Sequence, residues 1–209
     1  MKDLLRSQSG KRVAISLLMA AWMTLAGQAQ SIGIAELMFA PPAASITNWP
    51  TESYEFIELH NASPSVTLDL AGVKFTQGID YTFPLGATLP PGGYLVLIGT
   101  ADIAAFRAYY GLDESVTIVA AYSGALDNAG EQVTLRTSAG GTDIVSFTYN
   151  DGRGWPQAAD GAGHSLVLLD PALIPQGGSA GSYGGNWRAS TFVKGSPGRP
   201  DSPTPPGPV

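Results

Sequence analysis

Apolar and polar residues alternate in short runs along most of the chain, and turn-forming residues separate the runs. The segments 32–39 and 54–60 show the pattern well. In the second segment Glu55, Ile57 and Leu59 point to one face and the intervening residues to the other, since side chains alternate along a strand. Further strands are expected at residues 67–70, 73–77, 80–83, 94–99, 117–121, 132–137, 142–149 and 164–169. This periodicity predicts a chain built mainly of β-strands.

One segment has a different period. In residues 101–112 the apolar positions Ile103, Phe106 and Tyr110 are three or four residues apart, which is the spacing of one face of an α-helix. Gly111 follows at the position where a helix commonly ends in a left-handed glycine. The sequence therefore predicts one short helix inserted between two strands.

About nine or ten short strands joined by turns are typical of an antiparallel β-sandwich and not of a βαβ protein. The apolar faces of two such sheets bury each other about 10 Å apart. The residues expected in this core are Ile57, Leu59, Val96, Ile98, Val133 and Leu135. The predicted fold class is all-β, with one inserted helix.

Composition supports this fold class and removes several kinds of chemistry. The 209 residues include 26 Gly and 16 Pro, only 13% are charged, and none is cysteine. The many turn formers and few charges argue against a helical bundle, and the length suits one domain. Disulfides, zinc sites with thiolate ligands and cysteine nucleophiles are excluded.

The N-terminal segment has the order of a secretory signal peptide. Four basic residues precede the uncharged run 13–26, and small residues follow up to Ala29. This run is shorter than the roughly 20 residues needed to cross a membrane, so a signal over residues 1–29 is favoured over an uncleaved anchor. We expect a protein that is secreted and is extracellular, periplasmic or at the cell surface.

Removal of residues 1–29 leaves seven basic and 16 acidic residues, a net charge of −9. An acidic domain has no electrostatic footprint for phosphate backbones, so nucleic-acid binding is not expected. At the other end, residues 199–209 are rich in proline, which lacks the donor needed for a sheet ladder. We therefore expect a folded domain over residues 30–198 and a disordered tail over residues 199–209.

Ten short motifs, in order, carry a resemblance to a known family. They are IAELMFAP (34–41), EFIELHN (55–61), LDLAG (68–72), YTFP (81–84), LPPGGYLV (89–96), GEQVTL (130–135), GWP (154–156), DGAGHSL (160–166), NW (186–187) and GSPG (195–198). The chain resembles the lamin tail domain in the form found in secreted bacterial proteins. The resemblance implies an immunoglobulin-like β-sandwich that is an interaction or structural module and no enzyme in itself. One departure is Val73, where the family frequently has tryptophan.

Candidate catalytic carboxylates are few. Glu36, Glu55 and Glu58 cluster in the sequence, and a glycoside hydrolase needs two carboxyl groups facing one cleft about 5–9.5 Å apart. Glu55 and Glu58 are three residues apart on a strand and so lie on opposite faces. We expect these glutamates to be solvated strand positions or charges that protect a sheet edge.

Metal sites and a serine nucleophile find little support. Only His60 and His164 are present, without the spacing of a zinc motif. The segment 163–167 begins like a nucleophile elbow, but Val167 replaces its last glycine and no helix pattern follows. The oxygen-rich segment 127–131 does not match a calcium-binding loop and is expected to be a turn. We predict no metal and no cofactor.

Three tryptophans, Trp49, Trp155 and Trp187, lie in segments that read as loops. Aromatic side chains on sandwich loops either stack on a sugar or partner protein or cap the ends of the core. Trp155 and Trp187 are the candidate ligand-binding residues.

The sequence favours a monomeric, non-catalytic extracellular or cell-surface interaction or structural module. Its partner would be an unknown protein or a cell-envelope glycan. Two alternatives remain open: a secreted carbohydrate-binding domain that uses Trp155 and Trp187, and a small secreted hydrolase.

Overall fold

A computed structural model of the chain describes residues 31–42, 51–137, 141–152, 154–170, 173 and 180–202. The predicted signal peptide and Trp49 lie outside the described residues, as does the proline-rich segment from residue 203 onward. Among the described residues, no helix is long and apolar enough to cross a membrane.

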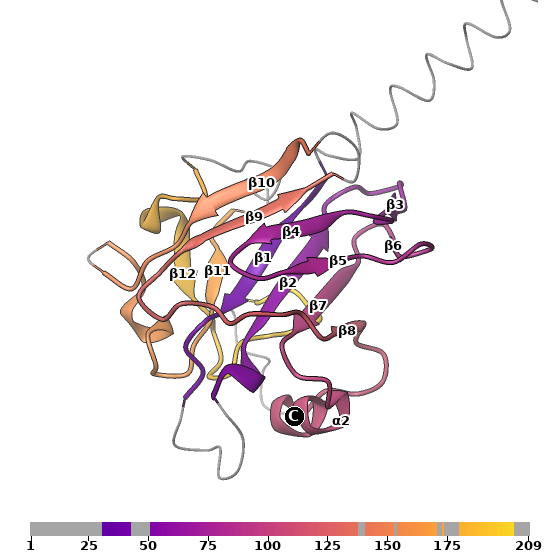
Figure 1. Ribbon diagram of the computed structural model, residues 1–209. Helices are drawn as coiled ribbons and strands as arrows, with labels where there is room; N and C mark the ends of the chain where they lie inside the picture. Colours follow the sequence, from indigo (N-terminus) through magenta and orange to yellow (C-terminus); the bar gives the residue numbers. More distant parts are fainter. Residues whose placement is uncertain are drawn as a thin grey trace, which may run out of the picture.

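Two main β-sheets form the body of the protein (Figure 1). The six-stranded sheet has the order β12-β11-β1-β2-β7-β8, and the four-stranded sheet has the order β10-β9-β4-β5. The first contains β1 (Ile32–Met38), β2 (Phe56–Asn61), β7 (Tyr94–Ile98), β8 (Ile118–Ala120), β11 (Leu166–Leu168) and β12 (Trp187–Ala189). The second contains β4 (Lys74–Gln77), β5 (Tyr81–Thr82), β9 (Gln132–Arg136) and β10 (Asp143–Thr148).

Smaller elements complete the described part of the chain. A two-stranded sheet joins β3 (Leu68–Asp69) to β6 (Thr88–Leu89). The α-helix is α2 (Ile103–Tyr110), and the short 3-10 helices are η2 (Thr51–Tyr54), η3 (Gln157–Ala159) and η5 (Gly184–Asn186). The strands β6 and β12 were not predicted from the sequence, because each has only two or three residues. The all-β sandwich with one short α-helix is confirmed.

The main core lies between the two large sheets. Ile57 and Leu59 of β2 face Val133 and Leu135 of β9 across it, and all four are fully buried. Phe39, Phe75, Phe83 and Tyr149 are among the largest buried side chains of this cluster.

Val96 and Ile98 are buried as predicted, but they lie on the opposite face of the six-stranded sheet. There they form a second core with Met38, Phe56 and Phe106 of α2. Every residue of β7 after Tyr94 is buried, since both faces of this strand are covered. A continuous apolar run does not show which residues point to which layer, and this is why the prediction failed.

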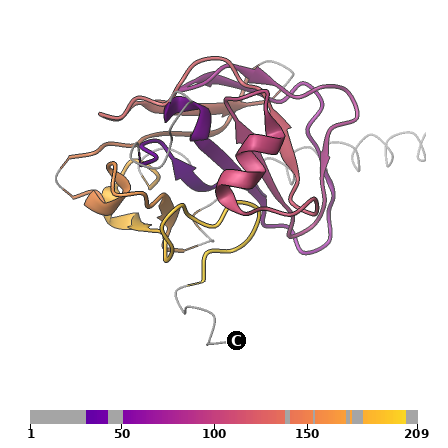
Figure 2. The same ribbon diagram turned by 90° about the horizontal axis from the view of Figure 1, so that it is seen from below.

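The helix α2 forms as its sequence dictates. The Asp102 carboxylate accepts a hydrogen bond from the Ala105 backbone N–H at 2.9 Å, and Gly111 ends the helix with φ 67°. Phe106 is its one buried residue and meets Phe56 edge-on, with ring centroids 6.3 Å apart. Figure 2 shows α2 and the C-terminal segment on the same side of the six-stranded sheet, opposite the four-stranded sheet.

One strand pairing departs from the antiparallel prediction. β8 pairs with β7 in parallel, in the register Val96↔Ile118. Parallel neighbours need a crossover connection of a dozen or more residues, and residues 99–117, which include α2, supply it. The inserted helix is therefore the crossover of a single βαβ unit at the edge of an otherwise antiparallel sheet.

Candidate functional site

Two buried carboxyl groups lie side by side on the outer face of the six-stranded sheet. Glu36 of β1 and Glu58 of β2 are direct cross-strand partners, and each is 1% exposed. A β-bulge between Ile34 and Glu36 creates this pairing. Ile34 pairs with Leu59, and both side chains point into the main core. In a regular strand Glu36 would point to the same side as Ile34, and the extra residue Ala35 turns it to the outer face.

The C-terminal segment covers this carboxyl pair. The Ser196 backbone N–H and hydroxyl donate to the two oxygens of Glu36 at 2.9 and 2.8 Å. The Ser165 hydroxyl donates to the same carboxyl group, and the Gly198 N–H donates to Glu58. The two side chains are therefore engaged by the protein itself.

Burial changes the acidity of both groups. Desolvation raises the pKa of Glu36 to about 7, although three hydrogen bonds from Ser165 and Ser196 oppose the shift. Desolvation also raises the pKa of Glu58 well above its ordinary value, and the negative charge of Glu36 adds to the effect. The prediction that these glutamates are solvated or edge-protecting was wrong, because the sequence does not show what covers a sheet.

Asp201 is a third buried carboxylate near this pair. Its side chain is 1% exposed and forms a 2.7 Å ion pair with Arg188 of β12. It also accepts a hydrogen bond from the Thr191 N–H at 2.7 Å. These contacts attach Asp201 to β12 and to the segment that follows it.

Glu55 is buried as well but belongs to a separate place. It accepts a hydrogen bond from the Leu126 N–H at 2.8 Å.

Within the described ranges no cleft opens onto Glu36 and Glu58, because Gly195, Ser196 and Gly198 close over them. The two carboxyl groups bind the C-terminal backbone and leave no space between them for a sugar.

The residues considered for a serine nucleophile have structural partners. Ser165 is fully buried and donates to Glu36, and strand β11 follows it where a nucleophile elbow requires a helix. His164 Nδ1 lies 2.7 Å from the Ser190 carbonyl oxygen. His60 stacks on Tyr94 at 4.3 Å, and its burial lowers its pKa.

Metal-binding geometry is not assembled among the described residues, where no group of three or more His, Asp or Glu side chains could hold an ion. In the segment 127–131 the carboxylates cap their own turn. Glu131 accepts from the Asp127 N–H at 2.9 Å, and Asp127 accepts from the Ala129 N–H at 2.8 Å.

Trp155 and Trp187 lie close together, with ring centroids 6.2 Å apart, but they form part of the core. Trp187 is 4% exposed, stacks on Phe147 at 5.3 Å and donates its indole N–H to the Gly181 carbonyl oxygen at 2.8 Å. It therefore presents no free ring face to a ligand. Trp155 is partly buried against the same cluster.

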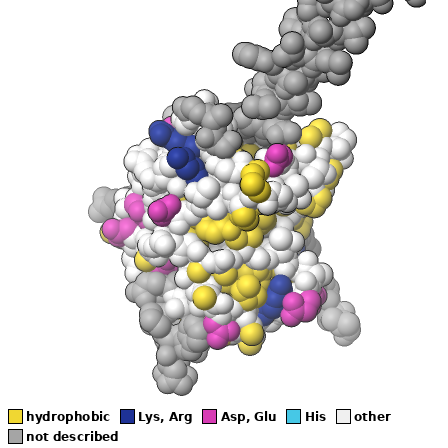
Figure 3. All heavy atoms as spheres, turned by 45° about the vertical axis from the view of Figure 1, so that its right-hand side comes forward, with side chains coloured by type: hydrophobic (Ala, Val, Ile, Leu, Met, Phe, Trp, Pro, Cys, Tyr) yellow, Lys and Arg dark blue, Asp and Glu magenta, His cyan; other side chains and the backbone are white. Residues whose placement is uncertain are grey.

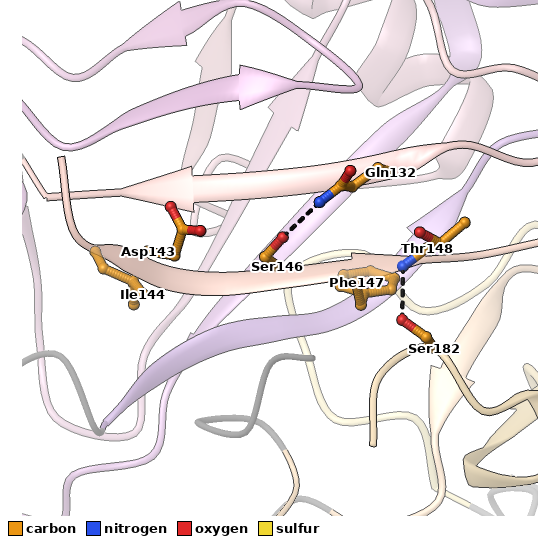
Figure 4. A pocket seen from close by; sticks show the side chains of 7 residues that line it. All are labelled: Gln132, Asp143, Ile144, Ser146, Phe147, Thr148 and Ser182. Atoms are coloured by element: carbon orange, nitrogen blue, oxygen red, sulfur yellow. Dashed lines mark hydrogen bonds between the residues drawn. The ribbon is translucent and has the colours of Figure 1, made fainter. Parts of the chain in front are cut away.

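A shallow hollow of about 470 Å³ lies along β10 (Figure 4). It is lined by Gln132, Asp143, Ile144, Ser146, Phe147, Thr148 and Ser182. Most of the lining is uncharged and polar, and Asp143 is paired with Arg136. Sequence reasoning missed this surface, since serine, threonine and glutamine on a strand carry no motif.

A chain of hydrogen bonds crosses the sheet beside the hollow. Gln132 donates to the Ser146 hydroxyl at 2.9 Å, and the Thr134 hydroxyl donates to the Gln77 carbonyl at 2.7 Å. The hydroxyls of Ser146 and Thr134 lie 2.9 Å apart. Because the Thr134 proton is already donated, Ser146 is the donor between them.

The backbone at the free edge of β10 can be assigned from the ladder. The Tyr149 N–H donates to the Glu131 carbonyl, so odd-numbered residues at this end of β10 bond to β9 and Ser146 and Thr148 face away from it. The Ser182 hydroxyl accepts from the Thr148 N–H at 2.9 Å. Ser146 has no such backbone partner among the described residues.

On the face seen in Figure 3 the basic side chains lie in two separate places, and one of these places is directly beside acidic side chains.

Comparison with known proteins identifies the family. The model of the Lamin Tail Domain matches residues 26–151, which is more than half of the chain. No curated protein and no solved structure matches the chain. The matched region holds the strands β1–β10, whereas β11, β12 and the segment over the carboxyl pair lie beyond it. The immunoglobulin-like fold of this family agrees with the two packed sheets described above, and the chain belongs to the lamin tail domain family.

Proposed function

We propose that this protein is a non-catalytic interaction module that acts outside the cell or at the cell surface. Its family membership supports a module of the interaction or structural kind. The signal-like N-terminal segment and the net charge of −9 after its removal support an extracellular location.

The observation that supports this proposal most is that the potentially reactive side chains bind other groups of the protein. The carboxylates of Glu36, Glu55 and Glu58 and the hydroxyl of Ser165 are buried and hydrogen-bonded within the protein. The described surface also has an open polar hollow beside β10. A site that has donors and acceptors but no free acid, base or nucleophile binds without reacting.

The free edge of β10 supplies the mode of binding. The N–H and C=O of Ser146 point away from β9, next to the hollow. An extended segment of a partner protein adds to such an edge through its main chain and places alternate side chains in the adjoining hollow. Ser182 already blocks the Thr148 end, so Ser146 is the central docking position.

A single substitution tests this mode. Ser146→Pro removes an outward N–H without removing a ladder bond, so the free energy of unfolding should change by less than about 1 kcal/mol. Immobilised protein of residues 30–209 would capture cell-envelope proteins, and we expect Ser146→Pro to lose the captured partner. Ser146→Ala keeps the N–H and should retain it.

Equal capture by wild type and Ser146→Pro would contradict docking at this edge. A defined hydrolytic product released from envelope material by the purified protein would contradict the non-catalytic function itself.

A carbohydrate-binding function is the second candidate, and the uncharged polar lining of the hollow favours it. Its site would include Gln132 and Ser146 in place of the buried Trp187. Retention on envelope polysaccharide that is lost with both Gln132→Ala and Ser146→Ala would select this function, since strand addition should survive Ser146→Ala.

A further inference from the structure

The C-terminal segment 195–201 closes over the outer face of the six-stranded sheet mainly through acidic groups. Glu36 receives two hydrogen bonds from Ser196, Glu58 receives one from Gly198, and Asp201 pairs with Arg188. Each of the first two contacts links a strand near the start of the chain with a residue near its end. The segment therefore depends on the state of two neighbouring carboxyl groups.

The fit of the segment is tight. Gly195 has φ 73°, and a Cβ atom there would lie 2.0 Å from Glu36 Oε1. Gly198 has φ 87°, and a Cβ atom there would lie 2.5 Å from Val116. The backbone thus lies directly on the carboxyl pair, with no room for solvent to screen the two groups.

We propose that Glu36 and Glu58 form a pH-sensitive latch, which holds segment 195–201 on the sheet while both carboxyl groups are protonated and loosens the segment as they ionise. Directly opposite residues of a non-hydrogen-bonded or hydrogen-bonded pair have Cβ atoms about 4.5–5.5 Å apart. Two negative charges on such neighbouring side chains, both shielded from water, repel strongly. Lifting the segment restores water to both groups and removes the repulsion.

The surrounding groups do not neutralise the pair. Arg188 forms its ion pair with Asp201 and not with the glutamates. The negative charge of Asp201 raises the pKa of both glutamates. Just before the covering segment, the Lys194 ammonium donates to the Tyr109 carbonyl at 2.8 Å and lies 4.1 Å over the ring of that residue. Arg199 is exposed.

Three other titratable groups on this face have pKa values that are shifted toward the neutral form. His60 lies on the same face of β2 as Glu58, and burial lowers its pKa. Tyr94 of β7 and Tyr110 of α2 have raised pKa values, chiefly through burial. Just before β11, Ser165 is uncharged, and the neighbouring His164 forms a hydrogen bond with the Ser190 carbonyl oxygen.

The direction of the switch follows from the raised pKa values. A carboxyl group whose pKa is higher in the closed form than in the open form stabilises closure at low pH and loses that stabilisation as pH rises through the closed-form value. For Glu36 that value is about 7, against about 4.3 for a solvated glutamate. Ionisation of Glu36 alone should therefore raise the opening constant of the segment about tenfold between pH 6 and pH 8.

The test is amide hydrogen exchange in the full chain, followed at Ser196 and Gly198 and corrected for the intrinsic pH dependence of exchange. We expect the opening constant at these two amides to rise about tenfold from pH 6 to pH 8, while amides of the main core do not change. The double variant Glu36→Gln/Glu58→Gln keeps acceptors at both places and should show no such rise. Glu55→Gln removes a different buried carboxyl group and should behave like wild type.

A wild-type opening constant that does not change with pH would overturn the latch, as would a double variant that keeps the wild-type slope. Equal changes at core amides would also overturn it, since they would indicate unfolding of the whole domain. If the double variant fails to fold, the side-chain carbon signals of Glu36 and Glu58 in wild type decide. Titration of at least one near pH 7 or above supports the latch, and titration of both near pH 4 contradicts it.

Discussion

Replacement of Trp187 by alanine separates a role in the core from a role in ligand binding. The side chain is 4% exposed, stacks on Phe147 and donates a hydrogen bond to the Gly181 carbonyl at 2.8 Å. Truncation of a buried tryptophan to alanine costs about 3–5 kcal/mol through lost burial and the cavity that remains. We expect Trp187→Ala to lose about 4 kcal/mol of unfolding free energy, near the middle of that range.

Trp187→Phe divides this loss into its parts. Phenylalanine keeps a ring against Phe147 but leaves the buried Gly181 carbonyl without its donor, which costs about 1–3 kcal/mol. Tyr183 serves as a matched control, because it is an aromatic residue of the same region that is 65% exposed. Tyr183→Ala should change the stability by no more than about 0.5 kcal/mol.

Urea unfolding followed by tryptophan fluorescence and circular dichroism measures all three variants. A fall in the midpoint with an unchanged slope reports a change in stability alone. A loss below about 1 kcal/mol for Trp187→Ala, far under the range for a buried tryptophan, would refute the core assignment. If the same variant also lost retention on polysaccharide, Trp187 would act at the surface as a ligand contact.

Two further substitutions test the packing on the outer face of the six-stranded sheet. Gly195→Ala places a Cβ atom against Glu36 at φ 73° and should lower the free energy of unfolding by about 2–5 kcal/mol, measured in urea. Gly161→Ala, with φ 75° and no atom within 4 Å, should lower it only by the conformational cost of about 1–2 kcal/mol. Equal losses would show that the contact with Glu36 is unimportant. Phe106→Ala empties the second core and should cost about 3–5 kcal/mol by the same assay, and a loss near zero would show that α2 is not anchored there.

Much of the fold could be predicted from local pattern. The alternation around Ile57 and Leu59 placed both side chains on one face of β2, and both lie in the main core. The three-and-four spacing up to Tyr110, followed by Gly111, placed α2 within two residues of its ends. These features depend on neighbours in the sequence, so the sequence contains them.

The features that failed depend on residues far along the chain. The bulge at Ala35 turns Glu36 to the outer face, and only the pairing with β2 shows it. The burial of Glu36 depends on Ser196, which is 160 residues away. Val96 looked like part of the main core because its strand is apolar throughout, and only α2 on the other side explains that run.

The candidate site was predicted less well than the fold. The tryptophans stood out in the sequence because large aromatics in loops often bind ligands, yet Trp187 is buried in the main core. The polar row through Ser146 and Thr134 did not stand out, since it is assembled across three strands from residues without distinctive chemistry. Sites made of ordinary residues become visible only when the strands are placed next to one another.

The order of the chain has a consequence for how the domain is completed. Glu36 and Glu58 belong to the first two strands of the large sheet, and the residues that shield them, from Ser196 onward, are among the last of the folded part. Closing so long a loop carries a large entropic cost, so this contact forms after the strands between have docked. Until then water surrounds both acids, and the free-energy cost of dehydrating them falls on the final step of assembly.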